Sequence, residues 1–251
     1  MKKVELQQVE HNVKPNDTCP YYEANITEDT IFTANGKPIG FYIKDVDKYN
    51  KKLTKLLVVA NTEFRSNRVP KSIMQRTSGV KQYSTILGGI IPRYSRRDAT
   101  TSSVHRSETA KTFIKAMLGC VSIGEQLIKE ITPEIYEKQQ EIFKDVDDNY
   151  KLGTMYTSSI SNFNIPANFH TDTGNLRDTV NIIFTKRLNS TGGSLHVPDY
   201  NATIEQADNS MLVYPAWRNM HGVTPINQLA SNGYRNSLVF YPLKYFKNNG
   251  Q

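Results

Sequence analysis

The sequence has few cysteines and no long apolar run, and both absences narrow the class of protein. Its two cysteines, Cys19 and Cys120, are far apart and form no CxxC pair, which excludes a disulfide framework and a zinc-thiolate site. No apolar stretch approaches the roughly 18–20 residues of a membrane span, and no apolar segment follows the two lysines at the start. We expect an intracellular protein without a membrane partner, cytoplasmic in a bacterial or phage-infected host and nuclear in a eukaryote.

Acidic residues are nearly absent between positions 65 and 106. Nine lysines and arginines there face Asp98 alone, so this segment carries +8 while the whole chain carries +7. A segment that holds the whole positive surplus suits nucleic-acid phosphate, although charge alone fits a solvated basic loop equally well. The candidate nucleic-acid contacts in it are Arg65, Arg68, Arg76, Lys81, Arg93, Arg96, Arg97 and Arg106.

The first 151 residues combine one hairpin with several helices. Asn35-Gly36 separates two β-rich runs, as in a tight hairpin turn. Apolar residues recur at helical spacing over residues 45–64 and again after Ser107, and Thr132 before a proline begins a third helix. Residues 78–97 mix glycine, proline and serine with a short apolar run, which indicates a loop with one or two strands.

Short β-rich runs separated by Gly, Asn, Asp or Pro fill residues 152–243. This texture is typical of a sandwich or jelly roll. No linker divides the two parts, so we expect one mixed α/β domain over residues 1–251. In it, residues 152–243 form the β core, and residues 1–151 form a helical and basic support region packed outside it together with the hairpin. A monomer is the simplest expectation.

Two histidines and an aspartate form the strongest chemical pattern. His170 and Asp172 are two residues apart at the end of a predicted strand, where alternation would turn both side chains to one face. His221 follows 49 residues later at the edge of another predicted strand. Two imidazoles and one carboxylate on one face of a metal suit Fe(II) and dioxygen activation. The alternative is a hydrogen-bonded trio in a β core.

An arginine and three polar residues extend this pattern. Arg235 at the head of the last β-run can form a fork to a carboxylate, and Ser237 on the same strand face can add a hydroxyl. An open iron site with a carboxylate clamp is what 2-oxoglutarate requires. Arg235 could instead pair with a surface acid. Asn164 and Asn175 flank the H-x-D turn and are candidate cosubstrate or substrate contacts, although turn chemistry also explains asparagines there.

Together these motifs resemble the TET/JBP family of nucleobase dioxygenases, within the Fe(II)/2-oxoglutarate-dependent dioxygenase superfamily. The resemblance rests on SNFNIPANFHTDTGN, GGSLHVPDY, SMLVYPAWRNMHGVTPI and YRNSLVFY, and more loosely on YSTILGGIIPRYSRRDATTSSVHR. It implies a double-stranded β-helix fold, with Fe(II), 2-oxoglutarate and O2 as cofactors. It also implies that His170, Asp172 and His221 bind iron, that Arg235 binds 2-oxoglutarate, and that the methyl group of thymine or 5-methylcytosine in DNA is oxidised.

DNA is then the expected partner, with the target base flipped out and the basic segment on the flanking phosphates. Two alternatives stay open. One keeps the chemistry but hydroxylates a small molecule or a protein side chain, and its activity would ignore ionic strength. The other is a nucleic-acid-binding module without turnover, which would have no reason to keep the two histidines, the aspartate and the arginine together.

Overall fold

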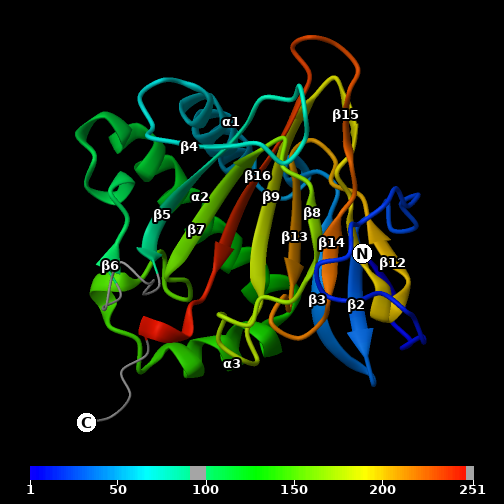
Figure 1. The fold of residues 1–251 in the computed structure, drawn as a ribbon. Helices are drawn as coiled ribbons and strands as arrows, with labels where there is room; N and C mark the ends of the chain where they lie inside the picture. Colours follow the sequence, from blue (N-terminus) through cyan, green and yellow to red (C-terminus); the bar gives the residue numbers. More distant parts are fainter. Residues whose placement is uncertain (91–99, 247–251) are drawn as a thin grey trace.

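The computed structural model describes residues 1–90 and 100–246, and its largest feature is a ten-stranded sheet (Figure 1). Nine strands follow the order β1-β2-β3-β13-β9-β16-β7-β5-β4, and β6 pairs with β5. Neighbours are antiparallel except for the parallel pair β1 and β2. The strands are β1 (Lys2–Glu5), β2 (Thr30–Ala34), β3 (Lys37–Ile43), β4 (Ser72–Met74), β5 (Gln82–Ile90), β6 (Thr100–Thr101), β7 (Ser158–Phe163), β9 (Asn181–Leu188), β13 (Ser210–Tyr214) and β16 (Tyr234–Tyr241).

A four-stranded sheet in the order β12-β11-β14-β8 lies against the large one. Its strands are β8 (Ala167–His170), β11 (Leu195–Val197), β12 (Ala202–Ile204) and β14 (His221–Val223), and β10 (Ser190–Gly192) pairs separately with β15 (Ile226–Gln228). From β7 to β16 the chain passes back and forth between the two larger sheets. This is the jelly-roll core, so the predicted mixed α/β fold class is confirmed.

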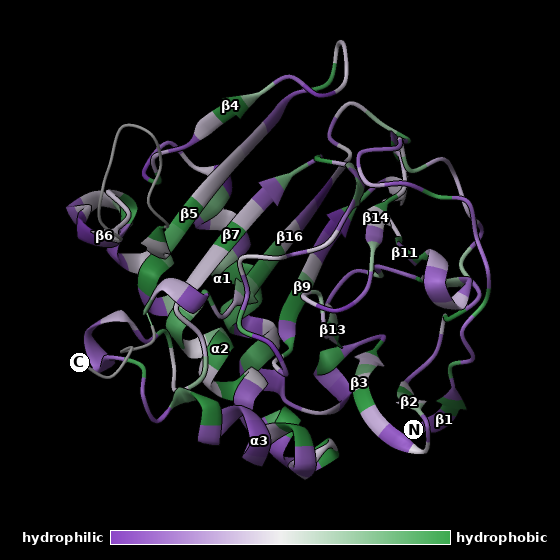
Figure 2. Cartoon of the chain, turned by 60° about the horizontal axis from the view of Figure 1, so that its bottom comes forward, coloured by the Kyte–Doolittle hydropathy of each residue, from purple (hydrophilic) through white to green (hydrophobic). Residues whose placement is uncertain are grey.

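Helices α1 (Lys51–Arg65), α2 (Lys111–Ile131) and α3 (Pro133–Phe143) cover the outer face of the large sheet (Figure 2). Gly124 lets α2 approach β9 closely, because a Cβ at this position would lie 2.9 Å from the Cδ1 of Ile182. No helix among the described residues is long and apolar enough to cross a membrane. Short 3-10 turns occupy Val46–Lys48, Val104–Arg106, Glu108–Ala110, Asp148–Tyr150, Pro198–Tyr200 and Lys244–Phe246.

Strand β9 shows how the sequence builds two apolar layers. Its alternate residues Ile182 and Phe184 belong to the core cluster shared with the helices, whereas Ile183 belongs to a second cluster with Leu195 and Leu212. Strand alternation sends these side chains to opposite faces, and burial of each such side chain contributes about 1.5–3 kcal/mol. Apolar residues on both faces thus hold this central strand between the helices and the four-stranded sheet.

Local signals set the details that the sequence pattern leaves open. The first helix begins at Lys51 rather than near residue 45, because the Asn50 side chain accepts from Leu53 N–H (3.0 Å). Asp45 instead caps the preceding 3-10 turn. The predicted hairpin lies at the edge of the core, where β3 pairs with β13, and β5 of the basic segment pairs with β7. Since one sheet joins strands of both parts, we infer a single domain.

Candidate active site

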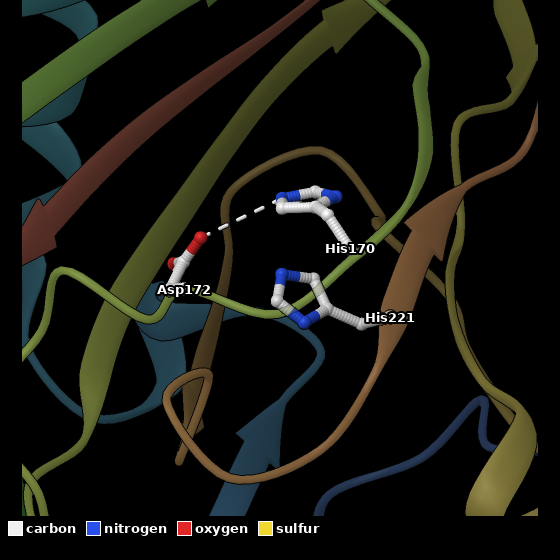
Figure 3. A group of neighbouring side chains, drawn as sticks. All are labelled: His170, Asp172 and His221. Atoms are coloured by element: carbon white, nitrogen blue, oxygen red, sulfur yellow. Dashed lines mark ion pairs between the residues drawn. The ribbon is translucent and has the colours of Figure 1, made fainter. Parts of the chain in front are cut away.

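His170, Asp172 and His221 come together between the two sheets (Figure 3). His170 ends β8 and His221 begins β14, where the two are cross-strand partners with ring centroids 4.4 Å apart. Asp172 lies beyond the end of β8, and its N–H donates to Ala216 O (3.0 Å). Its Oδ1 is 3.6 Å from His170 Nε2. One ligand atom from each residue lies within 4.8 Å of the others, so the three could hold one metal ion.

Both imidazoles are oriented in the same way. His170 Nδ1 donates to Asn168 O (2.7 Å), and His221 Nδ1 donates to Asn219 O (3.0 Å). A carbonyl only accepts, so each Nδ1 carries the proton and each Nε2 keeps its lone pair for a metal. Sequence reasoning missed this support, although a repeated N-x-H pattern marks both places. The Tyr214 hydroxyl also donates to Asn219 O (3.2 Å).

Two asparagines orient the carboxylate of Asp172. Asn181 Nδ2 donates to Asp172 Oδ2 (3.1 Å), and Asn175 Nδ2 donates to Asn181 Oδ1 (2.9 Å) and more weakly to the same Oδ2 (3.4 Å). The other oxygen, Oδ1, faces His170. The structure therefore places Asn175, a predicted cosubstrate contact, against a candidate metal ligand. Asn181 was not predicted, although an asparagine at the head of the apolar run NIIFT is a visible signal.

The electrostatics of the trio favour a neutral imidazole on β14. Burial lowers the pKa of His221 below its ordinary value, and the nearby charge of His170 acts in the same direction. The Asp172 carboxylate opposes both effects without reversing them. Because a metal binds the unprotonated ring nitrogen, this environment keeps His221 in the form that coordinates.

Arg235 and Ser237 line the same cavity as the trio, which measures about 600 Å³. Arg235 is only 3% exposed, and none of the ion pairs among the described residues includes it. Its Nε has no hydrogen-bond partner within the described part of the chain. Burial, helped by the nearby charge of Arg187, lowers the pKa of Arg235 to about 9. A buried guanidinium without an acidic partner favours binding of an anion.

Asn164 holds the strand that carries this arginine. Its Oδ1 accepts from Arg235 N–H (2.8 Å), and its own N–H donates to Arg235 O (2.9 Å). The backbone of Asn164 is left-handed, with φ 54°. Gly193 lies beside the Arg235 side chain, where a Cβ would lie 3.3 Å from Arg235 Nε. Asn164 thus positions Arg235, and it lines a second cavity rather than the one that contains the trio.

These residues fit the metal and the cosubstrate that the motifs imply. Two available Nε2 atoms and a carboxylate oxygen are the donors of a 2-His-1-carboxylate set, the ligand set of non-haem Fe(II) oxygenases. The orphaned Nε of Arg235 fits a dicarboxylate whose far end needs a donor. Iron and 2-oxoglutarate would supply oxygen activation when bound here.

The predicted nucleic-acid contacts are scattered around this site. Arg76 lines the cavity of the trio. Arg65 lies over the Tyr234 ring (4.1 Å), and Arg68 forms a two-point ion pair with Glu63. Lys81 lies 5.8 Å from the Tyr83 ring centroid, and Arg106 donates to Thr101. Arg93, Arg96 and Arg97 lie outside the described residues.

A family model and two solved structures are similar to this chain. The profile of the Tet_JBP family, described as the oxygenase domain of the 2OGFeDO superfamily, matches residues 92–244. The solved structure of NgTET1 in complex with 5mC DNA has a TM-score of 0.56 at 15% identity, over 92% of this chain and 84% of that chain. A 2OG-Fe(II) oxygenase family oxidoreductase from Burkholderia pseudomallei has a TM-score of 0.49 at 11% identity, over 84% and 88%. No curated protein matches the sequence. At these identities a structural likeness shows the fold alone.

Proposed function

Since this chain belongs to the Tet_JBP family, the oxygenase domain of the 2OGFeDO superfamily, we propose that it hydroxylates the methyl group of a 5-methylpyrimidine in DNA. The chain is an oxygenase, and its superfamily uses Fe(II), 2-oxoglutarate and O2. The substrate, either 5-methylcytosine or thymine, and the residue roles below are parts of the proposal.

In the proposed site, His170, Asp172 and His221 would hold the iron. Arg235 donates to the distal carboxylate of 2-oxoglutarate, and the Ser237 hydroxyl adds a further donor from the same cavity wall. Strands of both sheets line the cavity, and the burial of Arg235 in its wall strengthens the charge contacts of this guanidinium. The observation that carries this proposal is the buried Arg235, which has no acidic partner among the described residues, in one cavity with the metal-binding trio.

Two findings support DNA as the substrate. A protein of similar fold, NgTET1, is solved with 5mC DNA. In this chain Arg76 belongs to the segment that carries the positive surplus, and it lines the cavity that holds the trio. An arginine there can hold a phosphate beside a base that has left the stack, at an unstacking cost of a few kcal/mol.

The test is incubation with Fe(II), 2-oxoglutarate and oxygen, together with DNA that contains either thymine alone or added 5-methylcytosine. Nucleoside mass spectrometry should show an oxidised methyl group in one of the two, and His170→Ala should show none. Turnover should fall steeply as salt rises, since phosphate contacts release counterions. Succinate formation without any oxidised nucleoside would contradict the DNA substrate and favour a small-molecule or protein substrate.

A further inference from the structure

A second cavity of about 840 Å³ lies beside the first, on the other side of His170. The two share a wall formed by Arg76, Ala167, His170 and Val223. The second cavity follows the edge strand β8 and reaches β15, which extends beyond the sheets at the top of Figure 1. Its size falls within the range of roughly 300–1,000 Å³ of small-ligand pockets.

The chemistry of this lining is amide-rich and positive. Among the described residues that line it, none carries a carboxylate, and Arg76 supplies a guanidinium. Its amides and hydroxyls come from Asn16, Thr18, Thr77, Asn164, Asn168 and Asn227, and its apolar side chains include Val80, Phe169 and Ile226. This combination suits a nucleotide. The neutral donors and acceptors can pair with a base edge, the apolar side chains can contact a base face, and the guanidinium can bind a phosphate.

We propose that this second cavity binds the nucleotide next to the target base, with Arg76 on the phosphate that joins the two. The inference rests on the proposed DNA substrate. Arg76 stands in the wall between the cavities, so its guanidinium can reach the link between a base near His170 and a neighbour on the far side. The Arg76 guanidinium donates a long hydrogen bond from Nη1 to Pro166 O (3.4 Å), which a phosphate can replace.

Asn227 is the residue best placed to read the neighbouring base. It is exposed, it lies on the short strand β15, and it lines the second cavity but not the first. An amide can pair with a base edge in both directions, donating and accepting. Asn168 also faces this cavity, but its Nδ2 already donates to Asn16 O (3.1 Å).

The experiment measures binding of the iron- and 2-oxoglutarate-loaded enzyme to labelled duplexes without oxygen, by fluorescence anisotropy. Each duplex carries one 5-methylpyrimidine, and its 5′ or 3′ neighbour is either intact or replaced by an abasic linker. In the wild type, loss of the neighbouring base on one side should weaken binding roughly ten-fold, as loss of a stacked base does. Asn227→Ala should weaken binding to the intact duplex, and the abasic linker should then add little.

Arg76→Gln should weaken binding to every duplex and lower the slope of log affinity against log salt by about 1. Asn149→Ala and Lys129→Gln, on the helical side of the molecule, are matched controls and should behave like the wild type.

An abasic linker that costs the wild type less than two-fold on both sides overturns the inference, as does a full abasic penalty in Asn227→Ala. Unchanged DNA affinity with a raised KM for 2-oxoglutarate in both variants also overturns it, because the cavity would then be a cosubstrate passage. In aerobic reactions, product without any neighbour effect counts against this inference alone. A lack of oxidised nucleoside in every duplex counts against the proposed function itself.

Discussion

Asn181→Leu should separate metal binding from general stability. Leucine has the same branched arrangement of four side-chain heavy atoms as asparagine, but it removes the donor to Asp172 Oδ2 (3.1 Å) and the acceptor for Asn175 Nδ2 (2.9 Å). A hydrogen bond to a charged acceptor contributes about 1.5–3 kcal/mol. If that energy holds Asp172 in its metal-binding orientation, its loss lowers iron affinity roughly 10- to 100-fold, the range known for outer partners of metal ligands.

Anaerobic calorimetric titration with Fe(II) measures this affinity, and the visible absorption of bound Co(II) reports the ligand geometry without turnover. Thr185→Val is the matched control on the same strand, because Thr185 is fully buried and its hydroxyl donates to Gln206 (2.9 Å) away from the trio. Both variants should lose about 1–3 kcal/mol of unfolding free energy, but only Asn181→Leu should lose metal affinity. Wild-type iron affinity in Asn181→Leu, or equal losses in both variants, would refute the orienting role.

Three further predictions follow from the site and the core. His170→Ala should abolish succinate formation, measured by NMR, with little change in Tm because this side chain is 43% exposed. Residual turnover in this variant would contradict the assignment of His170 as a metal ligand. Arg235→Met should raise the KM for 2-oxoglutarate about 100-fold or more. It should also stabilise the ligand-free protein against urea by ~1 kcal/mol or more, because an unpaired buried charge is costly. A variant less stable than the wild type would contradict the unpaired state of Arg235. Burial lowers the pKa of His196 from 6.5 to about 4, so the unfolded chain binds a proton between these values while the folded protein does not, and stability falls as pH drops through this window. His196→Gln should remove about 1–3 kcal/mol of that fall between pH 7 and 4, and an unchanged pH dependence would count against it.

Much of the fold was predictable because short-range signals agree with the final packing. The hairpin at Asn35-Gly36, the helix that begins after Thr132 and the β-runs of residues 152–243 all form where the pattern puts them. The pairing partners were not predictable. Strand β3 joins β13, about 170 residues away, through a register that depends on which apolar faces meet in the folded state.

The residues of the candidate site also fall into those that the sequence predicts and those that it does not. The trio and Arg235 could be named because their chemistry demands particular residue types at particular strand ends. Asn181 and Asn219 could not, since asparagines are common at strand ends and turns for local reasons. Their roles come from atoms that meet only after folding: an amide beside Asp172, and a carbonyl beside His221. Arg93, Arg96 and Arg97 lie outside the described residues, so their phosphate contacts stay predictions.

The burial of Arg235 links the fold to the ligand. A guanidinium without an acidic partner among the described residues lowers the stability of the protein, yet Asn164 holds the Arg235 backbone and Gly193 leaves room beside Arg235 Nε. A dicarboxylate that binds it would remove that penalty only in the folded state, so ligand and stability are coupled. Addition of 2-oxoglutarate should therefore raise the Tm of the wild type in a concentration-dependent way. Arg235→Met should have a higher Tm without ligand, and its Tm should not rise when 2-oxoglutarate is added. The Arg235 side chain both lowers the stability of the free protein and binds the ligand that restores it.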